Sequence, residues 1–142
     1  MNVKHVVGLG VAVGLTGVAA QIPLMRMGVL ASGSLRAMLS LLLAVGIGFV
    51  AGNFAPREGV KAAALAGVIA GTMFSLIGLG AVLMNPAVIG QSPFTSPESF
   101  FMFVSSLAMS TVIVSWIVAG IAAIVALPVS LSRIAVLEEV TL

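Results

Sequence analysis

The feature that most limits how this chain can fold is a pair of apolar segments joined by a short charged turn, within residues 44–75. The turn, residues 56–61, contains Arg57, Glu58 and Lys61, whereas the flanking segments carry no charged residue. Each segment belongs to an apolar run long enough to cross a membrane as a helix. The pattern therefore predicts a transmembrane hairpin.

Both arms of this hairpin carry a strip of small side chains that recur every four residues, and a shorter strip of glycines lies in the first apolar segment of the chain. A spacing of four places side chains on one face of a helix. In lipid, small residues let helix backbones approach closely, so that van der Waals contact replaces the hydrophobic effect. The predicted helix-packing residues are Gly10, Gly14, Ala44, Gly48, Gly52, Ala63, Gly67, Gly71 and Ser75.

Composition extends this prediction to the whole chain. Of its 142 residues, 61% are apolar and 7% are charged, whereas soluble domains carry about 25% charged residues. Because each span needs about 20 residues, we predict an all-α, four-helix transmembrane bundle that forms one integral membrane domain over residues 1–142. The predicted spans are residues 6–25, 37–55, 62–84 and 99–127.

The boundaries of the fourth span carry recognisable signals. Ser96, Pro97 and Glu98 are typical of a helix start, since serine caps the helix, proline suits its first turn and glutamate favours the positive end of its dipole. Pro128 is expected to kink or end the span. The tail, residues 129–142, mixes apolar and polar residues and predicts either a short amphipathic helix along the membrane or a frayed terminus.

The first span has two interpretations. Its apolar core followed by Val18, Ala19 and Ala20 is typical of a secretory signal peptide with a small-residue cleavage site. The apolar run continues to Met25, however, which favours a retained first helix.

Charge predicts an orientation. Four spans place both termini and the turn on one side, with Lys4, Arg57, Lys61 and Arg133. The other side holds Arg26 and Arg36. By the positive-inside rule, both termini are expected to be cytoplasmic.

The chemistry available to the chain is narrow. None of the predicted spans contains Asp, Glu, Lys, Arg or His, and the chain has no Cys. A proton relay, an acid–base pair and a metal cluster all need such groups, and the lone His5 has no second ligand nearby. We therefore expect no enzyme, no cofactor and no metal site. The six Lys and Arg residues are scattered, so no nucleic-acid partner is expected.

Polar side chains inside the spans are the remaining candidates. Ser106, Ser110 and Ser115 form either a polar path or ligand groove along the fourth span, or ordinary hydrogen bonds between helices and to carbonyls of their own helix. Gln21 and Pro23 either loosen the first helix and expose a carbonyl or mark its end. Trp116, deep in the fourth span, is expected to anchor another helix or a lipid tail.

The hairpin also carries a resemblance. One span has Gly48 and Gly52 near its end, a short charged turn follows, and the next span runs from Gly59 through Gly67 and Gly71. This arrangement resembles small glycine-rich four-span membrane proteins of bacteria and archaea whose function is uncharacterised. The resemblance covers residues 44–75, implies a prokaryotic integral membrane protein, and supplies no catalytic residue. We expect a multi-pass protein of the cytoplasmic membrane.

Together these patterns predict a non-enzymatic membrane protein, a structural or accessory subunit that packs through its small-residue faces. Its expected partners are membrane lipids and other transmembrane helices, either in a homo-oligomer or in a larger membrane complex. The alternative is a small oligomeric transporter or channel lined by Ser106, Ser110 and Ser115.

Overall fold

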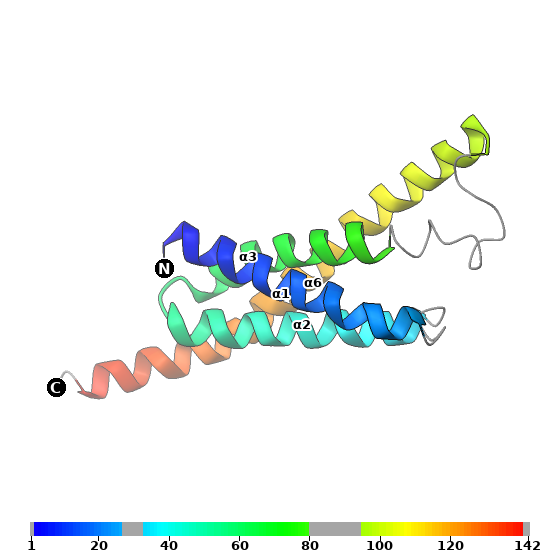
Figure 1. Ribbon diagram of the computed structural model, residues 1–142. Helices are drawn as coiled ribbons and strands as arrows, with labels where there is room; N and C mark the ends of the chain where they lie inside the picture. The colour runs from blue at the N-terminus through cyan, green and yellow to red at the C-terminus, as the bar shows by residue number, and fades with distance from the viewer. Residues whose placement is uncertain (1, 27–32, 80–94, 141–142) are drawn as a thin grey trace.

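A computed structural model describes residues 2–26, 33–79 and 95–140, and within these ranges the chain is helical and contains no strand (Figure 1). The elements are α1 (Val3–Arg26), α2 (Gly33–Phe54), α3 (Gly59–Met73), η2 (Phe74–Leu79) and α6 (Pro97–Val140). The described residues include four helices that are long and apolar enough to cross a membrane, with η2 continuing the third. The predicted all-α fold with four helices of membrane-spanning length is confirmed.

The first three helices lie close to the predicted spans. The third differs at its end, because α3 passes into the six-residue π-helix η2, which the sequence analysis did not anticipate. The last residues of the predicted third span, 80–84, lie outside the described residues. Pro23 lies inside α1, which continues to Arg26, so this proline does not end the helix.

The start of α6 matches its sequence signal. The helix begins at Pro97, with Glu98 in its first turn. The backbone N–H of Ser99 donates to the hydroxyl of Ser96 over 3.2 Å, and the N–H of Ser96 donates to the hydroxyl of Ser99 over 3.1 Å. This reciprocal pair satisfies a backbone donor that the helix itself leaves free.

The end of α6 differs from the sequence analysis in one respect, because that analysis expects Pro128 to kink or end the helix and treats the tail separately. The helix continues through Pro128 to Val140, and the tail is part of it. Residues on both sides of the proline pack on α2, Val125 on Gly48 and Val129 on Gly52. Membrane helices tolerate a proline when neighbouring helices support the chain around it.

The α2–α3 pair forms the middle of the bundle, with one helix on each of its two faces. Helix α6 packs against both α2 and α3, and α1 packs against the same two helices from the opposite side (Figure 1). The α6 helix has 44 residues and is about 66 Å long, against about 30 Å for a hydrocarbon core. It therefore crosses the bundle obliquely and extends beyond it at both ends.

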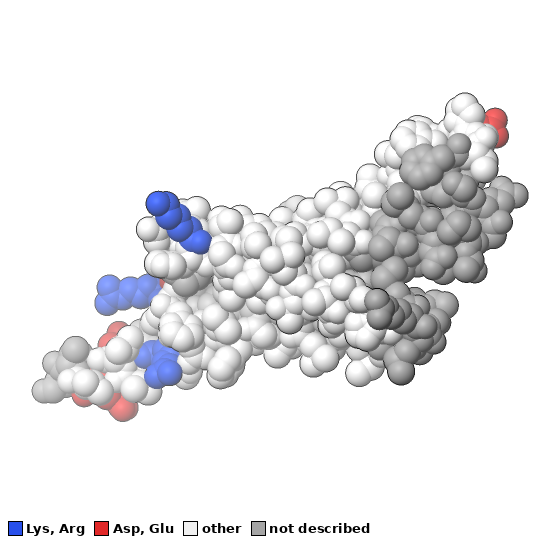
Figure 2. Space-filling view, in the orientation of Figure 1, with Lys and Arg blue, Asp and Glu red and all other residues white. Residues whose placement is uncertain are grey.

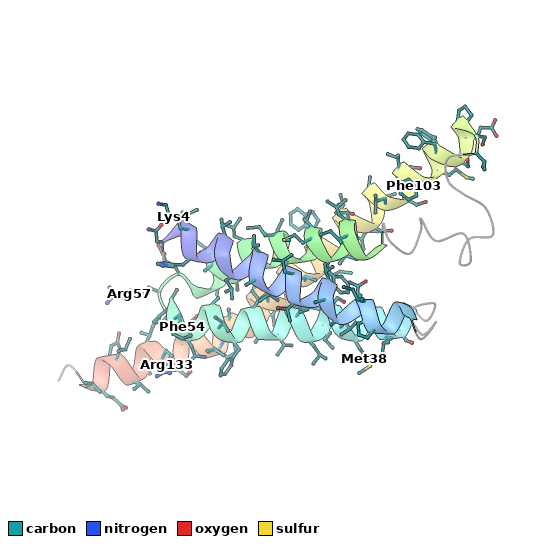
Figure 3. The ribbon with its side chains drawn as sticks, viewed as in Figure 1. Lys4, Met38, Phe54, Arg57, Phe103 and Arg133 are labelled. Carbon is teal, nitrogen blue, oxygen red and sulfur yellow. The ribbon has the colours of Figure 1, made fainter. Side chains whose placement is uncertain are left out.

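The core is made of small side chains. The buried cluster consists of Val6, Ala44, Ile47, Ala51, Ala62, Ala63, Ala66, Ala70, Val118, Ala122 and Ala126. Large apolar side chains point outward instead, among them Met38 and Phe54 (Figure 3). A soluble bundle buries its large side chains, whereas lipid accepts them on the surface and leaves the interior to close backbone packing.

Candidate functional site

The small-residue strip of α2 faces α6. A Cβ atom added to Gly48 would lie 2.5 Å from the carbonyl oxygen of Ala122, and one added to Gly52 would lie 2.8 Å from the Cβ of Val129. Real Cβ atoms do not approach backbone this closely, so only glycine fits at Gly48 without movement of the helices. The sequence spacing identifies this face but not the helix that covers it.

The small-residue strip of α3 also faces α6, and successive turns of the two helices are in contact. Added Cβ atoms would lie 2.7 Å from the Cα of Ala119 at Gly67 and 2.7 Å from the Cα of Ser115 at Gly71. These are contacts of backbone with backbone, which shorten the distance between the helix axes and maximise dispersion contact.

The glycines of α1 face α3. Added Cβ atoms would lie 2.9 Å from the carbonyl oxygen of Ala66 at Gly10 and 3.0 Å from the Cβ of Met73 at Gly14. Ala44, Ala63 and Ser75 are also buried. All nine predicted packing residues therefore lie inside the bundle of a single chain. Gly8, Gly46 and Gly120, by contrast, have no atom within 4 Å of an added Cβ.

Hydroxyl groups connect α6 to the third helix at mid-depth. The hydroxyls of Thr72 and Ser115 lie 2.9 Å apart, and the hydroxyl of Thr111 donates to that of Ser75 over 3.2 Å. Each α6 hydroxyl also reaches a carbonyl of its own helix, from Ser115 to Thr111 over 2.6 Å and from Thr111 to Leu107 over 2.7 Å. These groups are therefore engaged in packing between helices.

The three serines of the predicted polar path lie in different environments. Ser115 is buried and hydrogen-bonded, Ser110 lines an intramembrane cavity of about 690 Å³, and Ser106 is exposed away from that cavity. The cavity lies between α2, η2 and α6, and its other lining residues are Ser34, Ala37, Met38, Ser40, Leu41, Phe74, Ser75, Val114, Ile117 and Ile121. It is mainly apolar, and of the three serines it brings only Ser110 to its wall.

Two buried polar side chains in the described part of the chain have no hydrogen-bond partner. Gln21 is 1% exposed, and neither its amide nitrogen nor its amide oxygen is paired. The Ser130 side chain is 4% exposed, and its hydroxyl lies against Gly59, the first residue of α3. An unpaired buried group of this kind costs about 1–3 kcal/mol, so both positions lower the stability of the bundle.

Trp116 lies on the outward side of α6. It is 73% exposed, next in sequence to the buried Ser115. The residues that share this outward side are Met109, Trp116, Gly120, Ile124 and Leu127, here termed the outer face of α6. Trp116 is therefore largely uncovered by the helices of the described chain, and its neighbour Gly120 leaves open space beside it.

Charged side chains gather at the end of the bundle that holds the α2–α3 turn. Lys4, Arg57 and Arg133 lie at this end, together with Lys61 (Figure 2 and Figure 3). Acidic residues share the region, so the end is mixed in charge rather than purely basic. The Nε atom of Arg133 donates to the side-chain oxygen of Asn53 over 2.9 Å, which fixes this part of α6 beside the end of α2.

A second cavity, of about 740 Å³, opens at this end between the turn and the last part of α6. Its lining residues are Phe54, Ala55, Pro56, Arg57, Glu58, Ile134, Leu137 and Glu138. The sequence analysis did not find it, because the wall from Ile134 to Glu138 exists only when the helix continues past Pro128. Among the described residues, no group of three or more His, Asp and Glu could hold a metal ion.

Comparison with known proteins adds no relative, since no family model, curated protein or solved structure matches the chain. The fold itself defines a class. It has the four apolar helices typical of a multi-pass membrane protein.

Proposed function

We propose that this chain is a non-enzymatic integral membrane protein of the prokaryotic cytoplasmic membrane and serves as a structural or accessory subunit. It packs against another transmembrane helix through the outer face of α6, with a second copy of the chain as the first partner to test. The observation that carries this proposal is the outward position of Trp116 in the middle of α6.

The depth of Trp116 follows from its neighbours. Ser115 packs on Gly71, and the adjacent Ala70 packs on Gly14, which lies in the middle of α1. Tryptophan normally lies at the membrane interface, where its indole N–H finds a partner. At mid-depth in lipid that N–H has no acceptor, whereas a partner helix can supply one.

The shape beside Trp116 favours a helix as its partner. Gly120 is exposed, lies one turn further along α6, and has no atom within 4 Å of an added Cβ. A side chain from a neighbouring helix fits the notch between Trp116 and Ile124, in the manner of small-residue contacts between membrane helices. The strips on α2 and α3 are occupied by α6 of the same chain, so they are not the surfaces proposed for a partner.

The non-enzymatic part of the proposal rests on which ionisable and hydroxyl side chains the spans contain. The predicted spans lack ionisable residues, and the hydroxyls of Thr72, Thr111 and Ser115 are hydrogen-bonded within the bundle. A transporter or channel with a path along Ser106, Ser110 and Ser115 has less support, because these serines do not line one cavity.

Cysteine cross-linking tests the proposal, because the chain has no Cys of its own. With Gly120→Cys in native membranes we expect a disulfide-linked dimer, whereas Leu42→Cys, at an exposed position on α2, is expected to remain monomeric. If the two variants cross-link equally, or if neither forms any adduct, the outer face of α6 is not an assembly surface.

A further inference from the structure

The cavity at the charged end combines two kinds of wall. One wall is apolar, formed by Phe54, Ile134 and Leu137, with Phe54 79% exposed at the very end of α2. The other wall is charged, formed by Arg57 and Glu58 of the turn and by Glu138 of α6. A cavity with this division lies where the end of a membrane span meets water, and it suits a molecule that is itself half apolar and half charged.

We propose that this cavity binds a zwitterionic aminophospholipid of the phosphatidylethanolamine type. The phosphate lies against Arg57, the ammonium lies against the carboxylates of Glu58 and Glu138, and the acyl chains run along Phe54. This site is independent of the outer face of α6, and it adds a specific lipid ligand to the proposed role as a membrane subunit.

Charge complementarity is the main argument. The lining contains one guanidinium and two carboxylates, which disfavours a ligand that is only anionic. A zwitterionic headgroup satisfies both signs at once. Arginine binds phosphate through two parallel N–H bonds, and an ethanolamine ammonium offers three N–H donors to carboxylates, which a quaternary ammonium lacks.

The start of α3 reinforces the phosphate position. Glu58 is the N-cap residue of this 15-residue helix, and the first N–H groups of an α-helix have no acceptor within the helix itself. The helix dipole favours an anion at the same place. The buried and unpaired hydroxyl of Ser130 lies against Gly59 at this end, one turn before Ile134 in the cavity wall.

The geometry of the end keeps these groups together. Arg133 is bonded to Asn53, so the last turns of α6 are held beside the end of α2 rather than swinging free. Figure 3 shows Phe54, Arg57 and Arg133 at the same end of the bundle. The wall carried by α6 therefore stays opposite the turn.

Native mass spectrometry of the full chain in mild detergent, with lipids of identical acyl chains, tests the site. We expect phosphatidylethanolamine to bind about tenfold more tightly than phosphatidylcholine, as one charge-assisted hydrogen bond implies. Arg57→Gln and Glu138→Gln should each remove most of this preference, and both residues are exposed, so these variants should fold. Lys4→Gln, at the same end but outside the cavity lining, is the matched control and should retain the preference.

Two further measurements distinguish binding of the lipid from binding of other ligands. Glycerophosphoethanolamine and inorganic phosphate, added at the concentration at which the lipid saturates, are expected to leave the thermal midpoint unchanged, because they lack acyl chains to contact Phe54. A midpoint raised equally by inorganic phosphate would indicate a free-anion site and overturn the proposal. Tighter binding of phosphatidylglycerol than of phosphatidylethanolamine, or an unaltered preference in Arg57→Gln, would overturn it as well.

Discussion

The hydroxyl oxygens of Thr72 on α3 and Ser115 on α6 lie 2.9 Å apart at mid-depth in the bundle. Each hydroxyl also reaches a carbonyl of its own helix, from Thr72 to Val68 over 2.8 Å and from Ser115 to Thr111 over 2.6 Å. Each hydroxyl has one proton to donate, so the two hydroxyls share two protons among three hydrogen-bond contacts. The bond between the helices competes with the bonds inside each helix, which limits what it adds to stability.

Ser115→Ala is accordingly expected to destabilise the bundle only slightly. Hydrogen bonds between membrane helices contribute about 0.6 kcal/mol on average and about 1.7 kcal/mol at most. Unfolding by a denaturing detergent, followed by circular dichroism, measures the change. Ser132→Ala, which loses only a bond to the carbonyl of Val129 in its own exposed turn, is the control, and a loss above about 2 kcal/mol relative to it would mean that the hydroxyls carry more of the fold than their geometry implies.

Gly67→Ala is expected to cost more than Ser115→Ala, although it adds a single methyl group. That methyl would lie 2.7 Å from the Cα of Ala119, so the backbones of α3 and α6 must separate, at a cost of about 1–3 kcal/mol. Gly46→Ala is the matched control, since its methyl meets no atom within 4 Å and alanine favours the helix by up to about 1 kcal/mol. In the same detergent titration, the free energy of unfolding should fall for Gly67→Ala and rise for Gly46→Ala. Equal changes in the two variants would contradict the close contact.

Much of this fold could be predicted from the sequence because lipid imposes simple rules. Runs without charge mark the spans, and Ser96 with Pro97 marks the start of α6. The strip spacing marks faces such as that of Gly67, but it does not say which helix covers a face, because a strip of glycines fits any closely approaching backbone. That assignment depends on contacts between distant parts of the chain.

The charged cavity lay beyond sequence reasoning for a different reason. Pro128 normally ends a helix, yet α6 continues beyond it where Val125 and Val129 pack on α2. Without that tertiary support, no residue pattern places Glu138 opposite Arg57. The outward direction of Trp116 was hidden in the same way, because α6 is apolar on every side and its periodicity does not distinguish lipid from protein.

Trp116 fluorescence should report whether a partner covers the outer face of α6. The chain has one Trp and no Tyr, so its emission comes from a single position. In nanodiscs holding one chain each, phospholipids brominated along their acyl chains are expected to quench this emission strongly, because the ring is 73% exposed. Raising the protein-to-lipid ratio in vesicles should reduce the quenching as chains associate, and quenching that stays constant over that range would contradict assembly through Trp116.

The orientation can be tested with single cysteines in the Cys-free chain. Glu58, in the α2–α3 turn, and Ser96, before α6, lie at opposite ends of the bundle (Figure 1). Because Lys4, Arg57, Lys61 and Arg133 lie at the end with Glu58, against Arg26 and Arg36 on the other side, the positive-inside rule predicts that the Glu58 end is cytoplasmic. A membrane-impermeant thiol reagent added to intact cells should label Ser96→Cys and not Glu58→Cys, with the reverse pattern in inside-out vesicles. Labelling of Glu58→Cys from outside the cell would invert the proposed topology.

Gln21 provides a test of whether the bundle is complete by itself. Its amide is buried and unpaired in the described part of the chain, a state that costs about 1–3 kcal/mol. Methionine has a similar length and no hydrogen-bond requirement, so Gln21→Met should stabilise the isolated protein by up to that amount in the detergent titration. Thr16→Val, which loses a hydroxyl bonded to Ala12 on the exposed side of α1, controls for apolar substitution in the same helix. If Gln21→Met instead destabilised the protein in native membranes but not in detergent, the amide would have a hydrogen-bond partner in the membrane-embedded protein that the described residues do not supply.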